Sequence, residues 1–122
     1  MHASSVPMSD SREQTMNERY EACMRACDAC ARACDQCAVA CLREPDASGL
    51  AACVRLDVDC ALMCRFASGA IARRSARAGD VCRLCADICE ACARECDKHA
   101  HAHCRECAHA CRACASACVE MT

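Results

Sequence analysis

Cysteine repeats along most of this chain at alternating steps of three and four residues, in the positions where a helical bundle normally carries leucine. An α-helix turns once in about 3.6 residues, so this spacing places all thiols of one run on a single stripe. Charged and polar residues fill the positions between them. The three main runs are Cys23, Cys27, Cys30, Cys34, Cys37 and Cys41; Cys82, Cys85, Cys89, Cys92 and Cys96; and Cys104, Cys107, Cys111, Cys114 and Cys118.

The stretch between the first two runs carries the same pattern with one interruption. Cys53, Cys60 and Cys64 keep the spacing if Asp57 occupies the step that a cysteine would take. The pattern therefore predicts four helices, three rich in cysteine and one sparser, which all present thiols to a shared axis. The predicted fold class is all-α.

Capping signals set the expected beginning and end of the first helix. Ser11 and Gln14 have the spacing of a capping box, in which both side chains satisfy free backbone N–H groups. The helix is expected to run from there to about Arg43, before a proline. Residues 1–10 are then a flexible N-terminal lead-in, and residues 11–122 form one domain.

The other helix ends follow from similar signals. Asp46 or Ser48 is the expected N-cap of the second helix, which runs to about Arg77. Gly79 and Asp80 then provide a C-cap followed by an N-cap. The third and fourth helices are expected at about 81–98 and 102–120.

Short connections force successive helices to run antiparallel, so the prediction is an up-down-up-down four-helix bundle with a cysteine-lined core. A period near 3.5 residues predicts left-handed packing close to parallel. The turn after Cys41 and the turn that holds His99, His101 and His103 should then meet at the same end. The opposite end should gather Met16, Tyr20, Ile71 and Val81.

The second predicted helix carries an additional apolar stripe. Val54, Val58, Leu62 and Phe66 recur at helical spacing on the face away from the seam. Such a stripe packs either against a neighbouring subunit or within the monomer, and the sequence leaves both alternatives open.

Composition narrows the classes of function. The 122 residues include 19 cysteines and no tryptophan, and the formal net charge is -2, which disfavours nucleic acid as a partner. The first residues contain no apolar run, so neither a secretory signal nor a membrane span is expected, and the cytoplasm is the default location. An odd cysteine count and thiols along helices disfavour a disulfide scaffold. Without a general-base constellation or a glycine-rich phosphate loop, no enzyme is predicted.

Thiols at i and i+4 of a helix suit two-coordinate metal binding. Their Cβ atoms lie about 5 to 6 Å apart, and two sulfurs on opposite sides of one ion are about 4.4 Å apart. Soft thiolates select Cu(I), Zn(II) or iron–sulfur clusters, and a continuous ladder favours many Cu(I) ions, on the order of one per cysteine. The alternatives are a zinc or general metallothionein-like buffer, and an iron–sulfur or thiol redox protein.

Four further residues are candidate metal ligands. His99, His101 and His103 lie beside the thiol ladder, where neutral imidazole could pass copper ions inward, although solvated histidines are equally expected. Asp57 is a carboxylate in an apolar seam, which requires either a metal or a charged partner such as arginine. All 19 cysteines complete the predicted ligand set.

Residues from Tyr20 to Cys118 resemble the bacterial copper storage proteins, which include cytosolic members. The likeness rests on the helical Cys-x-x-x-Cys ladder and on the segment from His99 to Cys111. It implies a four-helix bundle that binds many Cu(I) ions for copper homeostasis, commonly as a homotetramer, with ions entering at one open end. The lack of a leader resembles the cytosolic branch. Further expected partners are a copper chaperone or a target cuproenzyme.

Overall fold

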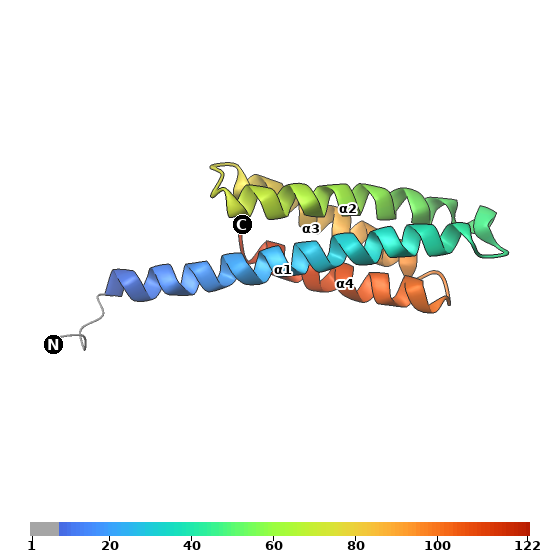
Figure 1. The fold of residues 1–122 in the computed structure, drawn as a ribbon, viewed down its shortest axis with the longest axis horizontal. Helices are drawn as coiled ribbons and strands as arrows, with labels where there is room; N and C mark the ends of the chain where they lie inside the picture. The colour runs from blue at the N-terminus through green and yellow to red at the C-terminus, as the bar shows by residue number, and fades with distance from the viewer. Residues whose placement is uncertain (1–7) are drawn as a thin grey trace.

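The computed structural model describes residues 8–122, so residues 1–7 of the predicted 1–10 lead-in lie outside the described residues. Four α-helices and one short 3-10 helix make up the described chain (Figure 1). They are α1 (Met8–Leu42), η1 (Ala47–Leu50), α2 (Ala51–Ala72), α3 (Ala78–Cys96) and α4 (Ala102–Val119).

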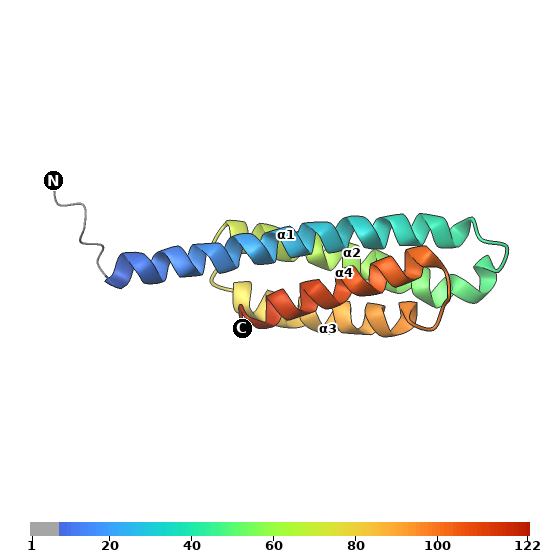
Figure 2. The ribbon, with the colours of Figure 1, turned by 90° about the horizontal axis from the view of Figure 1, so that it is seen from below.

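The helices form the predicted antiparallel bundle. α1 packs against α2 and α4, and α3 packs against the same two helices, so each helix has two neighbours around a shared axis. Both ribbon views show the first part of α1 projecting beyond the bundle (Figures 1 and 2). The α1–α2 and α3–α4 turns meet at the opposite end, where His103 contacts Glu44. The all-α, up-down-up-down prediction is confirmed.

The predicted start of the first helix is wrong. α1 already includes residues 8–10, which were expected to belong to the lead-in. Ser11 lies inside the helix, where its carbonyl oxygen accepts a 3.0 Å hydrogen bond from the Thr15 hydroxyl. A Ser-x-x-Gln spacing forms a capping box only when the backbone before the serine is non-helical, which is not the case here.

α2 ends five residues before the predicted position. Arg74 has a φ of 54°, the left-handed conformation in which a helix ends. Its N–H donates to the Ile71 carbonyl at 3.0 Å, and the Ser75 N–H donates to the Ala70 carbonyl at 2.9 Å. These two bonds define a Schellman motif. An arginine occupies the position that glycine usually takes, so no glycine in the sequence indicates the end of this helix.

Two predicted N-caps also differ in the structure. Asp80 lies in the first turn of α3, where it pairs with Arg83 at 3.0 Å, because α3 begins two residues earlier at Ala78. Asp46 precedes η1 without capping it and instead accepts a 3.2 Å hydrogen bond from His101. α2 follows η1 directly at Ala51, so no side chain caps it.

The core of the bundle is made almost entirely of sulfur and alanine. Every cysteine is at most 1% exposed, and Leu50 and Ile71 are the only larger aliphatic side chains among the fully buried residues of the described chain. Asp57 is the single buried charged residue there, with no exposed surface. The heptad pattern thus places all its cysteines and Asp57 inside, whereas Met16, where the predicted seam of the first helix continues, is exposed.

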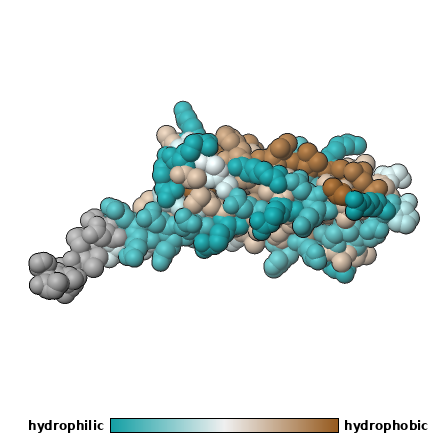
Figure 3. Space-filling model, viewed as in Figure 1, coloured by the Kyte–Doolittle hydropathy of each residue, from teal (hydrophilic) through white to brown (hydrophobic). Residues whose placement is uncertain are grey.

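One face of the bundle carries an apolar patch, brown over α2 in Figure 3. Val58, Leu62 and Phe66 of the predicted second stripe are exposed, and Val39 and Leu42 of α1 are exposed as well. We call these five residues the α1–α2 patch. Packing within the monomer, one of the two alternatives for this stripe, is therefore wrong for these three α2 side chains. No helix in the described part of the chain has the length and apolarity of a membrane span.

Candidate metal centre

Thiols at i and i+4 lie close to the separation that a two-coordinate ion needs. The sulfur atoms of Cys60 and Cys64 are 3.9 Å apart, and those of Cys107 and Cys111 are 4.0 Å apart. A linear S–metal–S unit needs about 4.4 Å, so small side-chain movements would open each pair to that distance.

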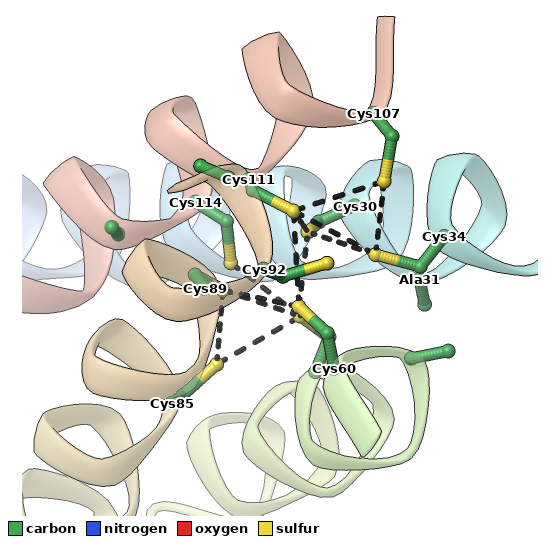
Figure 4. Close-up of a cluster of buried hydrophobic side chains, with 14 of the residues drawn as sticks. Cys30, Ala31, Cys34, Cys60, Cys85, Cys89, Cys92, Cys107, Cys111 and Cys114 are labelled. Carbon is green, nitrogen blue, oxygen red and sulfur yellow. Dashed lines mark hydrogen bonds between the residues drawn. The ribbon is translucent and has the colours of Figure 1, made fainter. Parts of the chain in front are cut away.

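Thiols of neighbouring helices are equally close. Cys34 of α1 lies 3.6 Å from Cys107 of α4, and Cys53 of α2 lies 3.5 Å from Cys96 of α3. Figure 4 shows sulfur atoms from all four helices converging on the bundle axis. The thiols therefore form one column and not four separate stripes.

Groups of four thiols lie within 4.8 Å of one another along the column. Five of these groups are Cys27, Cys85, Cys114 and Cys118; Cys30, Cys60, Cys64 and Cys89; Cys30, Cys34, Cys60 and Cys111; Cys34, Cys92, Cys107 and Cys111; and Cys37, Cys41, Cys53 and Cys104. Successive groups share members, such as Cys30 and Cys60.

This sharing bears on the choice of metal. One isolated group would suit tetrahedral zinc, because Zn–S bonds of about 2.3 Å place sulfurs near 3.8 Å apart. Structural zinc, however, takes four thiolates for itself, whereas Cu(I) accepts two or three thiolates. A continuous column with shared thiols thus favours many Cu(I) ions bridged by sulfur.

Burial is the main influence on the protonation of two thiols at the histidine-bearing end, Cys41 and Cys104. It raises the pKa of Cys41 to about 11, and the nearby Cys53 adds to the shift. Burial likewise raises the pKa of Cys104. These thiols therefore keep their protons near neutral pH when no metal is bound, and metal binding must release them.

Asp57 lies among thiols and not beside a cation. Its Oδ1 accepts hydrogen bonds from Cys107 at 3.2 Å and from Cys92 at 3.3 Å. Burial raises the pKa of Asp57 to about 9, and the electrostatic influence of the nearby Cys107 adds to the shift. Within residues 8–122 no arginine pairs with it, so the alternative of an ion pair at the mouth is wrong.

The three predicted histidine ligands have different environments. The Nδ1 atom of His103 lies 3.5 Å from the Cys37 sulfur and 3.6 Å from the Cys104 sulfur, beside one of the four-thiol groups. His99 instead pairs with Glu95 at 3.0 Å, and His101 with carboxylates of the α1–α2 turn. Only for His103 does the described structure bring a predicted imidazole ligand to the thiols.

Sequence reasoning missed the carboxylates that hold these rings. Glu95 is four residues before His99, a helical spacing that could have revealed the pair. Glu44 and Asp46 contact histidines from more than fifty residues away in the chain. The only signal for those contacts was the predicted meeting of the α1–α2 and α3–α4 turns at one end of the bundle.

A four-helix bundle with a continuous thiol column defines a protein that binds many thiophilic metal ions. The profile of the copper storage protein family, Csp, matches residues 16–122, and this chain belongs to that family. The resemblance that the cysteine ladder indicated is thereby confirmed. The family is named for copper storage and not for a catalysed reaction.

Several known proteins are similar to this chain in sequence, and the solved structures among them are also similar in fold. An uncharacterized cysteine-rich protein of Bacillus subtilis is 46% identical over 88 residues, 72% of this chain and 82% of its own. The Cu(I)-bound copper storage protein BsCsp3, from the same species, is 47% identical with a TM-score of 0.81, covering 84% of this chain and 97% of that one. A cytosolic copper storage protein from Streptomyces lividans with five coppers is 42% identical, with a TM-score of 0.83 and coverage of 85% and 92%.

Proposed function

We propose that this protein stores Cu(I) in the cytoplasm, holding many ions on the thiolates of its bundle core. The observation that supports this most is the column of four-thiol groups that share members. Thiolates that bridge successive ions would give a loading on the order of one ion per cysteine. Solved relatives with Cu(I) or five coppers bound support the choice of metal.

The ligand set that we propose contains all 19 cysteines and, at the open end, His103. His99 and His101 form the polar rim of this mouth, where carboxylates hold their rings. Asp57 would join the ligands once a bound ion displaces its proton to solvent, because four thiols surround it. Copper is the cargo here, and the protein has no catalytic role in this proposal.

The cellular setting follows from the relatives and the surface. The Streptomyces lividans protein is described as cytosolic, which supports the cytoplasm for this chain. The α1–α2 patch supports a homo-oligomer, and we propose a homotetramer. A chaperone or a recipient cuproenzyme would exchange copper at the histidine-bearing mouth, because all the thiols are buried and the partly exposed His103 there contacts them.

An anaerobic competition titration tests storage directly. Reduced protein is titrated with Cu(I) in the presence of a chromophoric Cu(I) chelator, and the same titration is run on protein whose thiols have been alkylated after unfolding. We expect the chelator to stay copper-free until on the order of ten or more ions have bound per chain. Competition after only a few ions would contradict the proposal and favour zinc or cluster chemistry.

A further inference from the structure

Glu44 lies where the two turns of the open end meet. It follows α1 by two residues, and its side chain is about one quarter exposed. Its backbone is fixed on both sides: its N–H donates to the Cys41 carbonyl at 3.2 Å, and its own carbonyl accepts from Ala47 at 3.1 Å. The carboxylate is therefore held at a defined place relative to Cys41, a member of the outermost four-thiol group.

The carboxylate of Glu44 contacts two histidines. Its Oε2 atom accepts a 2.8 Å hydrogen bond from Nε2 of His103 and lies 3.3 Å from Nδ1 of His101. The two imidazole rings are stacked, with centroids 5.2 Å apart and planes 5° from parallel. One glutamate thus fixes a pair of rings at the mouth of the thiol column.

This contact assigns the proton on His103. A carboxylate can only accept a hydrogen bond, so Nε2 carries the hydrogen, and in a neutral ring Nδ1 is left with its lone pair. Nδ1 is the atom that faces Cys37, Cys41 and Cys104, at 3.5, 3.9 and 3.6 Å. The lone pair is therefore directed at the thiols of the outermost group.

His101 provides a contrast at the same mouth. Its Nδ1 faces Glu44 and its Nε2 faces Asp46 at 3.2 Å, so both of its nitrogens lie against carboxylates. With a carboxylate against each nitrogen, His101 has no ring nitrogen that faces the thiols. Of these two rings, only His103 has a nitrogen available for an ion.

We propose that Glu44 is the positioning residue of the outermost copper site. By fixing the Nε2-protonated tautomer, it makes Nδ1 of His103 the first ligand that an incoming Cu(I) ion meets beside Cys37, Cys41 and Cys104. Histidine ligands of metals commonly donate their other N–H to a carboxylate, and loss of that partner weakens binding by about 10- to 100-fold. This proposal rests on the storage function and adds a residue that touches no ion itself.

Nitrogen NMR of the metal-free, reduced protein tests the tautomer without any copper. At about pH 8 an ordinary imidazole is neutral, so its two ring nitrogens report which one carries the hydrogen. We expect one tautomer for His103, protonated at Nε2, in the unchanged protein and in Glu106→Ala, and a mixture in Glu44→Ala. Glu106 is an exposed glutamate of α4 and serves as the charge-matched control. A His103 protonated at Nδ1 in the unchanged protein would overturn the proposal.

Copper transfer tests the consequence. One equivalent of Cu(I) is delivered from a chromophoric chelator complex, and the rate of transfer is followed by stopped flow. We expect Glu44→Ala and His103→Ala each to slow this transfer by about 10- to 100-fold, and the double variant to be no slower than His103→Ala alone. Glu106→Ala should stay within about twofold of the unchanged protein.

The outcomes separate this proposal from the storage function. Multiplicative effects in the double variant, or equal slowing by Glu106→Ala, would show that Glu44 acts only through its charge and would overturn the positioning role. The final number of ions bound per chain should be unchanged in every variant. A low number already in the unchanged protein would instead contradict storage itself, whatever the NMR result for His103.

Discussion

At the scale of single residues, Asp57 is the most unusual side chain of the core. It replaces one thiol of the α2 seam and accepts hydrogen bonds from Cys92 and Cys107. A buried carboxylate without a cation is tolerated when it is protonated, which agrees with a pKa raised to about 9 by burial. In the metal-free protein Asp57 therefore behaves as a neutral acid, and it gains a charge only when the core opens or binds metal.

This raised pKa predicts a pH dependence of the metal-free protein. An unfolded aspartate has a pKa near 3.9, so between that value and about pH 9 the folded state binds one proton more. The contribution of Asp57 to stability is therefore complete below about pH 4 and is lost as the pH rises toward 9. Over this range the contribution of Asp57 to the free energy of unfolding can fall by about 1.4 kcal/mol for each pH unit.

Urea unfolding of the reduced, metal-free protein and of Asp57→Asn, at several values between about pH 5 and about pH 8, measures this effect. Asparagine stays neutral, so the stability of the unchanged protein should fall relative to that of the variant as the pH rises. Contributions of the 19 cysteines are common to both proteins. If the unfolding free energies of the two proteins changed equally with pH, Asp57 would already be ionised in the folded state.

At the scale of elements, the end of α2 depends on a contact with α1. Arg74 is left-handed, its guanidinium donates to the Ile71 carbonyl at 2.6 Å, and it stacks 4.0 Å from the ring centre of Tyr20. Tyr20 in turn packs against the core. The arginine thus ends one helix and ties it to its neighbour at the end of the bundle away from the histidines.

Substitution of Arg74 separates these two roles. Arg74→Ala keeps a residue with a Cβ atom in the left-handed conformation. It loses the stacking on Tyr20 and the hydrogen bond to the Ile71 carbonyl, so we expect a loss of about 1 kcal/mol in unfolding free energy. Arg74→Gly relieves the backbone cost and should recover about half of that loss. Arg73→Ala, an exposed neighbour, should change stability by less than about 0.5 kcal/mol. Chemical denaturation gives all three values, and a glycine variant less stable than the alanine variant would contradict the backbone argument.

The helices were predictable from the sequence to different degrees along their length. The heptad spacing of Cys23 to Cys41 suffices to bury all six thiols, because periodicity alone decides which face of a helix lies inside. The ends were less predictable. Arg74 ends α2 where no glycine signals a stop, and Asp46 bonds to His101 instead of capping a helix. Such choices depend on residues that are distant in sequence, and local signals do not contain them.

At the scale of the whole molecule, the α1–α2 patch is an unpaired surface on a small bundle. Side chains at the centre of such a patch lose their water contacts when copies associate, so a charge introduced there should prevent assembly. We expect Leu62→Glu to convert the proposed tetramer into smaller species, as measured by sedimentation velocity. Ala113→Glu adds the same charge on an exposed position of α4 and should leave the assembly intact. If both variants sediment like the unchanged protein, the patch is not the interface.

Stability of the whole bundle should also depend on copper. A core of cysteine and alanine buries less apolar area than one of leucine, so the metal-free fold gains less from the hydrophobic effect. Ions that bind only the folded state add stability by mass action, and in the proposed site thiolates from all four helices would hold them. The unfolding temperature should therefore rise steadily as copper is added.

The position of a thiol in the column should determine how much of the stabilisation by copper depends on that thiol. Cys60 lies within 4.0 Å of four thiols, Cys30, Cys64, Cys89 and Cys111, whereas Cys82 lies near the end of the column in the first turns of α3. Cys60→Ala removes a thiol that more than one four-thiol group shares, and it should lower the copper-induced rise in unfolding temperature more than Cys82→Ala does. Both replacements delete one buried sulfur, so their metal-free forms provide the matched reference. Equal losses of the copper-induced rise would mean that the ions occupy separate sites, and the bridged column would then be wrong.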